Sequence, residues 1–388
     1  MEKQNKFSQI LVKSFSYILV AALASYGTLY FCDQAPQSSK LTQLEEIITE
    51  RFIGEADQTA MEDAAAAAMV ASLGDRWSYY IPASEYDAHV EQLQNAYVGI
   101  GVTISTPEKG EGVEVLQIEP TGGAKAAGIQ IGDVILAVEG KLISQIGIDE
   151  AKKLIRGEEG TQVELTIRRG EEELTLAVTR QIIQVEVASG QMLEDNIGLV
   201  TINNFDERCA DETLAAVEAL VEQGARALIF DVRFTPGGYK TELVEILDYL
   251  LPEGPLFRSL HYTGQETVDE SKADCLEMPM AVLINGSSYS AAEFFAAALN
   301  EYDWAVVVGE PTVGKSYFQN TIPLDDGSAV GLSVGKYFTP NGVSLADEGG
   351  LQPEILVEVD DETTAKIYAR ELEPKDDPQV QAAIEALK

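Results

Sequence analysis

Residues 281–319 read AVLINGSSYSAAEFFAAALNEYDWAVVVGEPTVGKSYFQ, and they predict two buried strands on either side of one helix. The run Ala281-Val-Leu-Ile284 is short, apolar and β-branched, which is typical of a buried strand. Residues 285–288 break this pattern, and residues 290–299 have the composition of a helix. Residues 304–308 form a second apolar run, so the stretch indicates an α/β fold.

Ser290 lies where the first strand gives way to the helix. Backbone N–H groups at a helix start lack intrahelical partners, and together with the helix dipole they favour a developing oxyanion. Serine is also a preferred helix cap. Taken alone, Ser290 therefore fits two interpretations, a nucleophile or a simple cap.

Lys315 follows the second apolar run and a turn-rich loop at residues 309–314, so we expect it at the end of a buried strand. Burial lowers the pKa of an amine, and a neutral amine can take the proton of a serine hydroxyl. Gln319, four residues later, is spaced to hold the amine through its side-chain carbonyl. A solvated surface charge is the alternative for Lys315 alone. The serine, lysine and glutamine together suit amide-bond cleavage without histidine.

Three motifs in this stretch resemble those of the carboxy-terminal processing peptidases, also called tail-specific proteases. They are Ser288-Tyr-Ser290-Ala-Ala-Glu293, Val308-Gly-Glu310, and Gly314-Lys315 followed by Gln319. The resemblance implies that Ser290 is the nucleophile, Lys315 the general base and Gln319 the residue that orients the lysine. It covers nearly the whole chain from residue 41 onward.

A glycine-rich loop supplies the expected oxyanion hole. Arg233-Phe-Thr-Pro-Gly237-Gly238 resembles the family's Arg-x-Asn-Pro-Gly-Gly turn, with Thr235 where asparagine is usual. Glycines let backbone N–H groups approach an acyl carbon closely. The resemblance implies an oxyanion hole made by Gly237 or Gly238 with Ala291. An ordinary turn at the end of a strand is the alternative.

Residues 97–184 change to short strands separated by glycine turns, and residues 124–138 are very like the helix, turn and strand of a PDZ domain. A PDZ domain adds an extended carboxy-terminal peptide to the edge of its sheet. The resemblance implies that Gly99, Ile100 and Gly101 hold the terminal carboxylate beside an apolar pocket. A purely structural module is the alternative.

Composition excludes several other classes of protein. The net charge of −37, from 64 acidic and 27 basic residues, argues against nucleic acid as a partner. There are only two histidines, and no C-x-x-C or H-E-x-x-H spacing is present, so we predict no metal site and no cofactor. Cys209 and Cys275 either pair or stay reduced, and the sequence does not decide between these states.

The amino terminus predicts a membrane anchor. Residues 1–13 carry three lysines, and residues 14–32 form an uncharged, mostly apolar span that we interpret as a transmembrane signal anchor with residues 1–13 in the cytoplasm. A cleaved signal peptide is the alternative, because Ala22-Leu-Ala24 fits a small-x-small site. We therefore expect a single-pass protein of the cell membrane with an extracytoplasmic catalytic part.

We expect a multidomain α/β protein whose core, by resemblance, has a layered fold like that of crotonases and ClpP. An amino-terminal helical segment and a small β-rich α+β PDZ domain precede that core. The terminal helix at residues 376–387 and the amino-terminal helices are the expected contacts of a homodimer. The expected domains are the helical region 41–96, the PDZ domain 97–184, the serine peptidase core 185–360 and the helical tail 361–388.

The predicted function is that of an extracytoplasmic serine endopeptidase working through an acyl-enzyme. Its PDZ domain recognises protein or peptide substrates by their apolar carboxy-terminal tails. One alternative is a PDZ scaffold with an inactive or activator-dependent protease domain. Thr235, and Tyr289 where the family usually has a small residue, are the departures that suggest it. Another is an acyl-CoA enzyme of similar layered fold, but such enzymes lack a serine-lysine pair.

Overall fold

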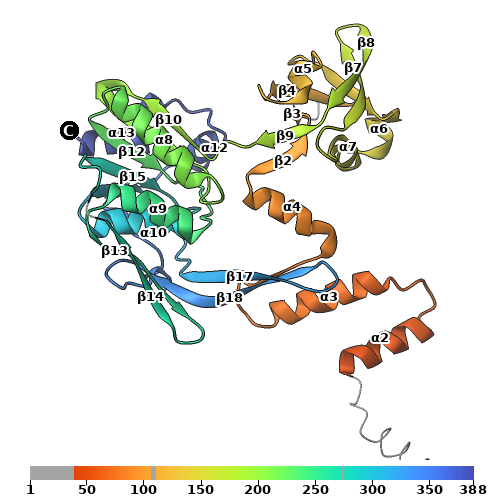
Figure 1. Ribbon diagram of the computed structural model, residues 1–388, viewed down its shortest axis with the longest axis horizontal. Helices are drawn as coiled ribbons and strands as arrows, with labels where there is room; N and C mark the ends of the chain where they lie inside the picture. Colours follow the sequence, from red (N-terminus) through yellow and green to blue (C-terminus); the bar gives the residue numbers. More distant parts are fainter. Residues whose placement is uncertain (1–38, 106–110, 273) are drawn as a thin grey trace, which may run out of the picture. The chain divides into compact units, whose positions relative to one another are not determined.

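The computed structural model describes residues 39–105, 111–272 and 274–388 (Figure 1). The chain forms two compact units that meet between Gly74 and Asp75. In the first unit, helices α2 (Lys40–Arg51) and α3 (Gln58–Ala71) begin at the side-chain caps Ser39 and Asp57. Neither helix contains a buried residue.

The larger part of the second unit is built on a six-stranded sheet. Strands β11, β12, β15, β16 and β19 run parallel, and β10 pairs antiparallel with β11 at one edge. The two strands predicted from residues 281–284 and 304–308 are β15 and β16. The bounds in sheet order are β10 (Ala188–Met192), β11 (Ile197–Ile202), β12 (Ala227–Asp231), β15 (Met280–Ile284), β16 (Ala305–Gly309) and β19 (Ile355–Leu356).

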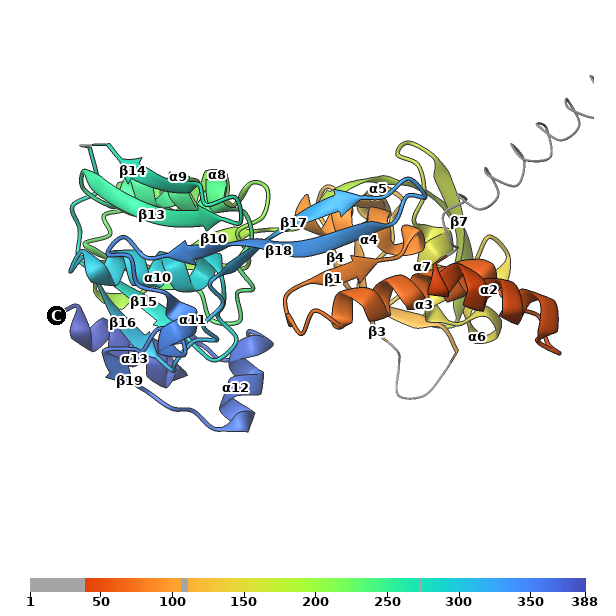
Figure 2. The ribbon, with the colours of Figure 1, turned by 90° about the horizontal axis from the view of Figure 1, so that it is seen from below.

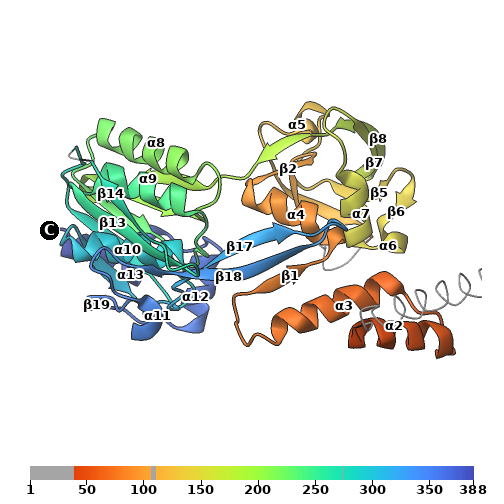
Figure 3. The same cartoon turned by 60° about the horizontal axis from the view of Figure 1, so that its bottom comes forward.

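Helices cover both faces of this sheet. Val282 and Ile284 of β15 pack into the cluster that contains α8 (Cys209–Glu222), α9 (Lys240–Leu250) and α10 (Ala291–Glu301). Ala281 and Leu283 face the cluster that contains α13 (Pro378–Ala386). Figure 3 shows α8 and α9 side by side. Both faces of β15 are buried, so its residues are continuously apolar. This unbroken apolar run is the signal that predicted the strand from the sequence.

The carboxy-terminal tail continues from the parallel sheet. It contains α12 (Asp361–Tyr368) and a 3₁₀ turn, η2 (Pro374–Asp376), before α13, whereas the short helix α11 (Leu345–Glu348) lies between β18 and β19. Val380 and Ala383 of α13 are buried in the protein's own core. The predicted terminal helix therefore forms, but its apolar face packs on the sheet.

A second, antiparallel sheet packs on the opposite side of α10 (Figure 2). Phe257 of this sheet meets Phe294 of α10 edge to face, with ring centroids 5.1 Å apart. Strand β18 pairs with β1, β13 and β17, although β1 lies more than 200 residues before it in the chain. The bounds are β1 (Tyr79–Ile81), β13 (Gly254–His261), β14 (Glu266–Ser271), β17 (Tyr317–Pro323) and β18 (Ala329–Phe338).

Residues 96–184 form a small β-rich module with its own hydrophobic core. Helix α4 (Ala83–Leu93) precedes it, and β2 (Ala96–Gly99) pairs with β9 (Gln181–Gln184). Its main sheet has the order β3-β4-β5-β7-β8, with β6 beside β5. The bounds are β3 (Val102–Ser105), β4 (Val113–Ile118), α5 (Gly123–Ala126), β5 (Val134–Val138), β6 (Lys141–Leu142), α6 (Ile143–Ile146), α7 (Ile148–Ile155), β7 (Gln162–Arg169) and β8 (Glu172–Thr179).

The predicted cellular location needs correction. No helix among the described residues is long and apolar enough to cross a membrane. The longest of these helices, α3 and α8, have 14 residues each, whereas a span needs about 20. This finding overturns the predicted single-pass membrane protein with an extracytoplasmic catalytic part. The segments expected in the cytoplasm and in the membrane, residues 1–13 and 14–32, lie outside the described residues.

Candidate active site

Ser290 occupies a strained turn between β15 and α10. It is the N-cap of α10, and its backbone has φ 58° and ψ −126°. Residues other than glycine rarely adopt this backbone conformation. Such a conformation costs about 1–3 kcal/mol and persists only when its surroundings enforce it. Ser290 is 7% exposed, and its backbone N–H donates to the Glu293 carboxylate at 2.9 Å. The serine is therefore both a helix cap and a residue held in an enforced backbone conformation.

The glycine loop after β12 lies directly against this turn. A Cβ added to Gly237 would come within 2.8 Å of both the Ser290 Cβ and the Ala291 nitrogen. A Cβ on Gly238 would collide with the backbone of Phe205 at 2.2 Å. Among the described residues, the N–H groups of Gly237, Gly238 and Ala291 have no acceptor. The structure thus brings the predicted oxyanion donors together and leaves them available.

Hydrogen bonds fix the glycine loop to the nucleophile turn. Thr235 is fully buried, and its hydroxyl donates to the Ile202 carbonyl at 2.7 Å, while its own carbonyl accepts the Tyr289 N–H at 3.2 Å. The side-chain oxygen of Asn285 accepts the Phe234 N–H at 3.0 Å. Thr235, the departure from the family pattern, therefore supports the loop with satisfied hydrogen bonds.

Lys315 lies in the loop between β16 and β17, with its amine between two aromatic rings. Its Nζ is 4.7 Å from the centroid of the Trp77 ring and 5.7 Å from that of Tyr289. The two rings are stacked, with centroids 6.0 Å apart and an interplanar angle of 27°. Both distances to Nζ are within the range of a cation–π contact.

Burial lowers the pKa of Lys315 below its ordinary value of 10.5. The negative charges of Asp75 and Glu293 oppose this effect, and the positive charge of Arg76 reinforces it. The net direction is toward the neutral amine that a general base requires.

A buried carboxylate ties the serine turn to the lysine loop. Glu293 is 0% exposed and accepts the N–H groups of Ser290 at 2.9 Å, Gly314 at 2.6 Å and Lys315 at 2.8 Å. It also accepts the Thr312 hydroxyl. Sequence reasoning assigned Glu293 no role, although its position three residues after Ser290 is that of a capping box.

Gln319 lies in β17 and makes different contacts from those predicted. Its side-chain N–H₂ donates to the Ser333 hydroxyl at 2.9 Å and to the Tyr317 carbonyl at 3.2 Å. Among the described residues, no hydrogen bond joins Lys315 to Gln319 or to Ser290. Catalytic hydrogen bonds are often long before substrate binds, so the predicted roles of the three side chains stay predictions.

Comparison with known proteins identifies the family. Residues 196–357 match Peptidase family S41, and residues 114–169 match the PDZ domain. The chain is 32% identical over 364 residues to the carboxy-terminal processing protease CtpA of Bacillus subtilis, covering 89% of this chain and 77% of that protein. The chain belongs to the carboxy-terminal processing peptidases of family S41.

One further relative and one solved structure are similar to this chain. Carboxyl-terminal-processing peptidase 2 of the Arabidopsis thaliana chloroplast is 30% identical over 301 residues, covering 74% of this chain and 58% of that protein. The crystal structure of a Bacteroides fragilis protein assigned to the S41 proteases superposes with a TM-score of 0.51 at 14% identity, covering 91% of this chain and 98% of that chain. The first supports the family, and the second supports the fold alone.

This S41 peptidase is thus a serine-type, carboxy-terminal processing hydrolase of peptide bonds. It has the predicted multidomain α/β architecture, with a helical amino-terminal segment, a PDZ domain and a protease core. Its protease and PDZ domains indicate proteins or peptides as substrates.

The predicted carboxylate loop of the PDZ domain lies between β2 and β3. Ile100 is 2% exposed, and the carbonyls of Ile100 and Gly101 accept the N–H groups of Ala124 and Glu119 at 2.9 and 3.0 Å. The N–H groups of Ile100 and Gly101 have no acceptor in the described part of the chain. Strand β3 is an edge of its sheet, as a peptide-adding strand must be.

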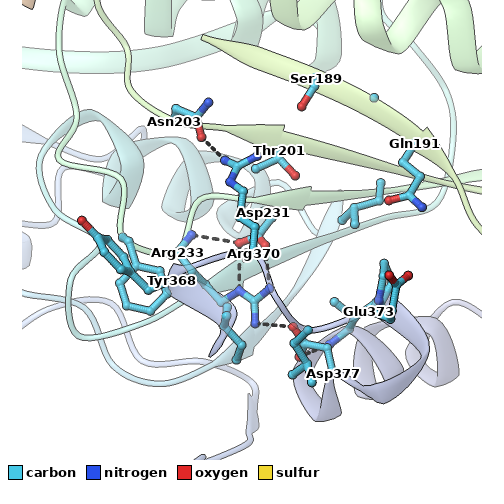
Figure 4. A pocket seen from close by; sticks show the side chains of 17 residues that line it. Ser189, Gln191, Thr201, Asn203, Asp231, Arg233, Tyr368, Arg370, Glu373 and Asp377 are labelled. Carbon is cyan, nitrogen blue, oxygen red and sulfur yellow. Dashed lines mark hydrogen bonds and ion pairs between the residues drawn. The ribbon is translucent and has the colours of Figure 1, made fainter. Parts of the chain in front are cut away.

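A cavity of about 740 Å³ is lined by Asp231, Arg233 and Asp377, among other residues (Figure 4). The buried Arg233 guanidinium pairs there with Asp231 at 2.6 Å and with Asp377 at 2.9 Å, which ties α13 to the end of β12. Neither Ser290 nor Lys315 lines this cavity. Arg233 is the first residue of the glycine loop, so its ion pairs fix where that loop begins.

Proposed function

We propose that this peptidase cleaves peptide bonds with Ser290 as nucleophile and Lys315 as general base. The neutral amine of Lys315 takes the Ser290 proton as the hydroxyl oxygen attacks the peptide carbonyl. The oxyanion is held by the N–H groups of Gly237 or Gly238 with Ala291. Lys315 then protonates the leaving amine, and water releases the acyl-enzyme. Gln319 orients the lysine once substrate is bound.

The observation that carries this proposal is the shared carboxylate of Glu293. It accepts the backbone N–H groups of Ser290 and Lys315 at 2.9 and 2.8 Å, so the predicted nucleophile and base belong to one hydrogen-bonded unit. Free N–H donors at Gly237 and Ala291 lie beside the same serine. A decayed scaffold has no need to keep this arrangement.

The test compares wild type with Ser290→Ala and Lys315→Ala on unfolded peptides that end in apolar residues. Cleavage by wild type and its loss in both variants is expected. Because burial lowers the pKa of Lys315, wild-type activity should rise with pH at values below 10.5. Equal cleavage by all three proteins would exclude the dyad, and no cleavage by any of them would favour the scaffold or activator-dependent alternative.

We propose further that the PDZ domain recruits substrates by their apolar carboxy-terminal tails. The free N–H groups of Ile100 and Gly101 and the open edge of β3 support this role. The test compares the cleavage of two peptides of identical sequence, one ending in a free carboxylate and the other in an amide. It separates capture of the carboxylate from a purely structural role of the PDZ domain. A higher KM for the amidated peptide, with kcat unchanged, is expected, whereas equal KM values would exclude carboxylate capture.

The amino-terminal helices support a proposal of homodimerisation. Leu44, Ile47 and Phe52 are 52%, 50% and 58% exposed, an apolar face that the described chain leaves uncovered. The double variant Leu44→Glu/Ile47→Glu should be monomeric in analytical ultracentrifugation if wild type is a dimer. A wild-type protein that sediments as a monomer at all concentrations would exclude the dimer.

A further inference from the structure

The segment from Asp75 to Ile81 lies far from the catalytic stretch in sequence but belongs to the same unit of structure. Strand β1 pairs with β18 in the register Tyr79 to Gly331, and the Tyr79 hydroxyl lies 3.0 Å from that of Thr321 in β17. The Ser78 hydroxyl donates to Asp75 at 2.6 Å. Backbone pairing and side-chain hydrogen bonds therefore fix this segment against the β17–β18 hairpin.

A second set of contacts connects this segment with Gln319. The Ser333 N–H donates to the Ser78 hydroxyl at 3.1 Å, and the Ser333 hydroxyl accepts the Gln319 side chain at 2.9 Å. Ser333 also hydrogen bonds to Asp75 and thereby lowers the pKa of that carboxyl, although burial opposes the effect. The segment thus reaches the predicted orienting glutamine through one serine.

Trp77 stands within this fixed segment and covers the lysine. Its ring lies 4.7 Å from the Lys315 Nζ and stacks with Tyr289, the neighbour of the nucleophile. The Arg76 guanidinium carbon also lies over the indole, 4.1 Å from its centroid. Trp77 therefore contacts the predicted base, the residue next to the predicted nucleophile and a nearby cation.

We propose that Trp77 is a positioning residue for the general base, because its indole shields the Lys315 amine from water and holds it against Tyr289. This inference rests on the proposed Ser290–Lys315 mechanism. The indole does not react; it sets the environment in which the lysine exchanges its proton. Asp75, Glu293 and Arg76 are the charged groups that act on the lysine, and their side chains are left unsubstituted in the Trp77 variants.

Two effects of the indole on Lys315 have opposite signs. Exclusion of water favours the neutral amine, and the cation–π contact favours the charged form. Burial is the largest cause acting on this lysine, and its pKa is lowered overall. Removal of the indole should therefore raise the pKa of Lys315 toward 10.5, so that less neutral base is present at neutral pH.

The experiment uses the full chain and four variants. Trp77→Ala removes the cover, Trp77→Phe keeps an aromatic face, and Trp77→Leu keeps apolar cover without a π face. Tyr262→Ala, which removes a ring that is 75% exposed, is the control for loss of an aromatic side chain. The readouts are the pH profile of kcat/KM and the titration of the Lys315 Cε resonance in ¹³C-lysine-labelled protein, assigned with Lys315→Ala.

For Trp77→Ala we expect the acid limb of the profile to move up by about one pH unit, which is about a tenfold loss of kcat/KM on that limb. Activity should recover at higher pH, and the lysine resonance should shift its midpoint by the same amount. Trp77→Phe and Tyr262→Ala should keep the wild-type limb, and Trp77→Leu, which keeps the apolar cover but loses the cation–π contact, should not move it up. If Trp77→Ala does not fold, a further variant, Trp77→Gln, should move the limb up because its polar side chain admits water to the amine. An unchanged limb in Trp77→Gln, or an upward shift in Trp77→Leu, would overturn shielding.

An unchanged limb and an unchanged lysine midpoint in Trp77→Ala, with only a lower Tm, would overturn the inference and leave Trp77 a packing residue. The proposed mechanism has its own separate test, since its failure would appear as cleavage by Ser290→Ala. The lysine titration does not depend on activity. Failure of the mechanism and failure of the shielding role are therefore distinguishable.

Discussion

The serine turn and the lysine loop are held by different kinds of interaction. The backbone of Ser290 is constrained by hydrogen bonds, with an unfavourable φ of 58° and a buried carboxylate on its N–H. The backbone of Lys315 shares that carboxylate, but its side chain rests between aromatic rings. The comparison teaches that hydrogen bonds set the geometry of the turn that carries Ser290, whereas burial lowers the pKa of the Lys315 amine.

The largest effect should follow from Glu293→Ala, because this carboxylate holds both the serine turn and the lysine loop. Four donors lose their buried acceptor, each at a cost of about 1–3 kcal/mol in stability. Displacement of either reacting group by 1 Å costs about 100-fold in rate, so near-complete loss of activity is expected. Urea unfolding and kcat measure the two effects. The exposed Glu348→Ala is the control, and near-normal kcat in Glu293→Ala would contradict the shared anchor.

A narrower change, Gly237→Ala, tests the serine side alone. The new Cβ would lie 2.8 Å from the Ser290 Cβ and the Ala291 nitrogen, so the loop must move away from its oxyanion position. We expect kcat to fall about 10²–10³-fold with little change in KM, as for loss of an oxyanion donor. Gly264→Ala is the matched control, since its φ of 83° is close to the 85° of Gly237 but no atom lies near its Cβ. Similar kcat values for the two variants would exclude the oxyanion role.

The substitution Gly331→Ala should disturb the surroundings of Lys315 indirectly, through the segment that carries Trp77. A Cβ there would lie 2.3 Å from the Tyr79 ring, which must then leave its place beside β18 and shift the segment that carries Trp77. The acid limb of kcat/KM should move in the same direction as for Trp77→Ala but by less than its tenfold effect. Adding Tyr79→Ala should restore part of the loss in a double-mutant cycle. Strict additivity of the two substitutions would exclude this route.

The smallest effect on activity should come from Asp206→Asn, which changes stability instead. Burial, with the charges of Glu207 and Glu242, raises the pKa of Asp206 to about 7. The folded state therefore keeps a proton that the unfolded chain releases near pH 4, and stability falls as pH rises through this window by roughly 4 kcal/mol. In urea unfolding, Asp206→Asn should lose less stability than wild type between pH 5 and pH 8. The exposed Asp325→Asn should behave as wild type, and parallel curves for Asp206→Asn would refute the shift.

The sequence predicted the parts of the site that depend on local pattern. Strands β15 and β16 are buried on both faces, so their apolar runs were visible, and a helix start placed Ser290 at the turn. Strand β17 was missed because its residues are half-buried or exposed and show no clear alternation. Because β17 was missed, the contacts of Gln319 were missed too. Its side-chain amide donates to the hydroxyl of Ser333 in the neighbouring strand β18.

Contacts between residues far apart in the chain could not be predicted from the sequence, for a different reason. Nothing in the pattern of residues 75–81 says that Trp77 will lie over Lys315, because that contact depends on the pairing of β1 with β18. The role of Glu293 was missed, although a capping box could have indicated its bond to Ser290. Its bonds to Gly314 and Lys315 could not be found in this way, because these residues approach the carboxylate only in the folded chain.

The shared carboxylate also limits how this enzyme can move. Separation of the serine turn from the lysine loop would leave the fully buried Glu293 carboxylate without part of its hydrogen bonds, a step far more costly than rotation of a side chain. The two loops should therefore travel as a single rigid body during turnover. A switch between resting and working forms is then confined to side-chain rotamers around the amine and to the strand hairpin that borders it.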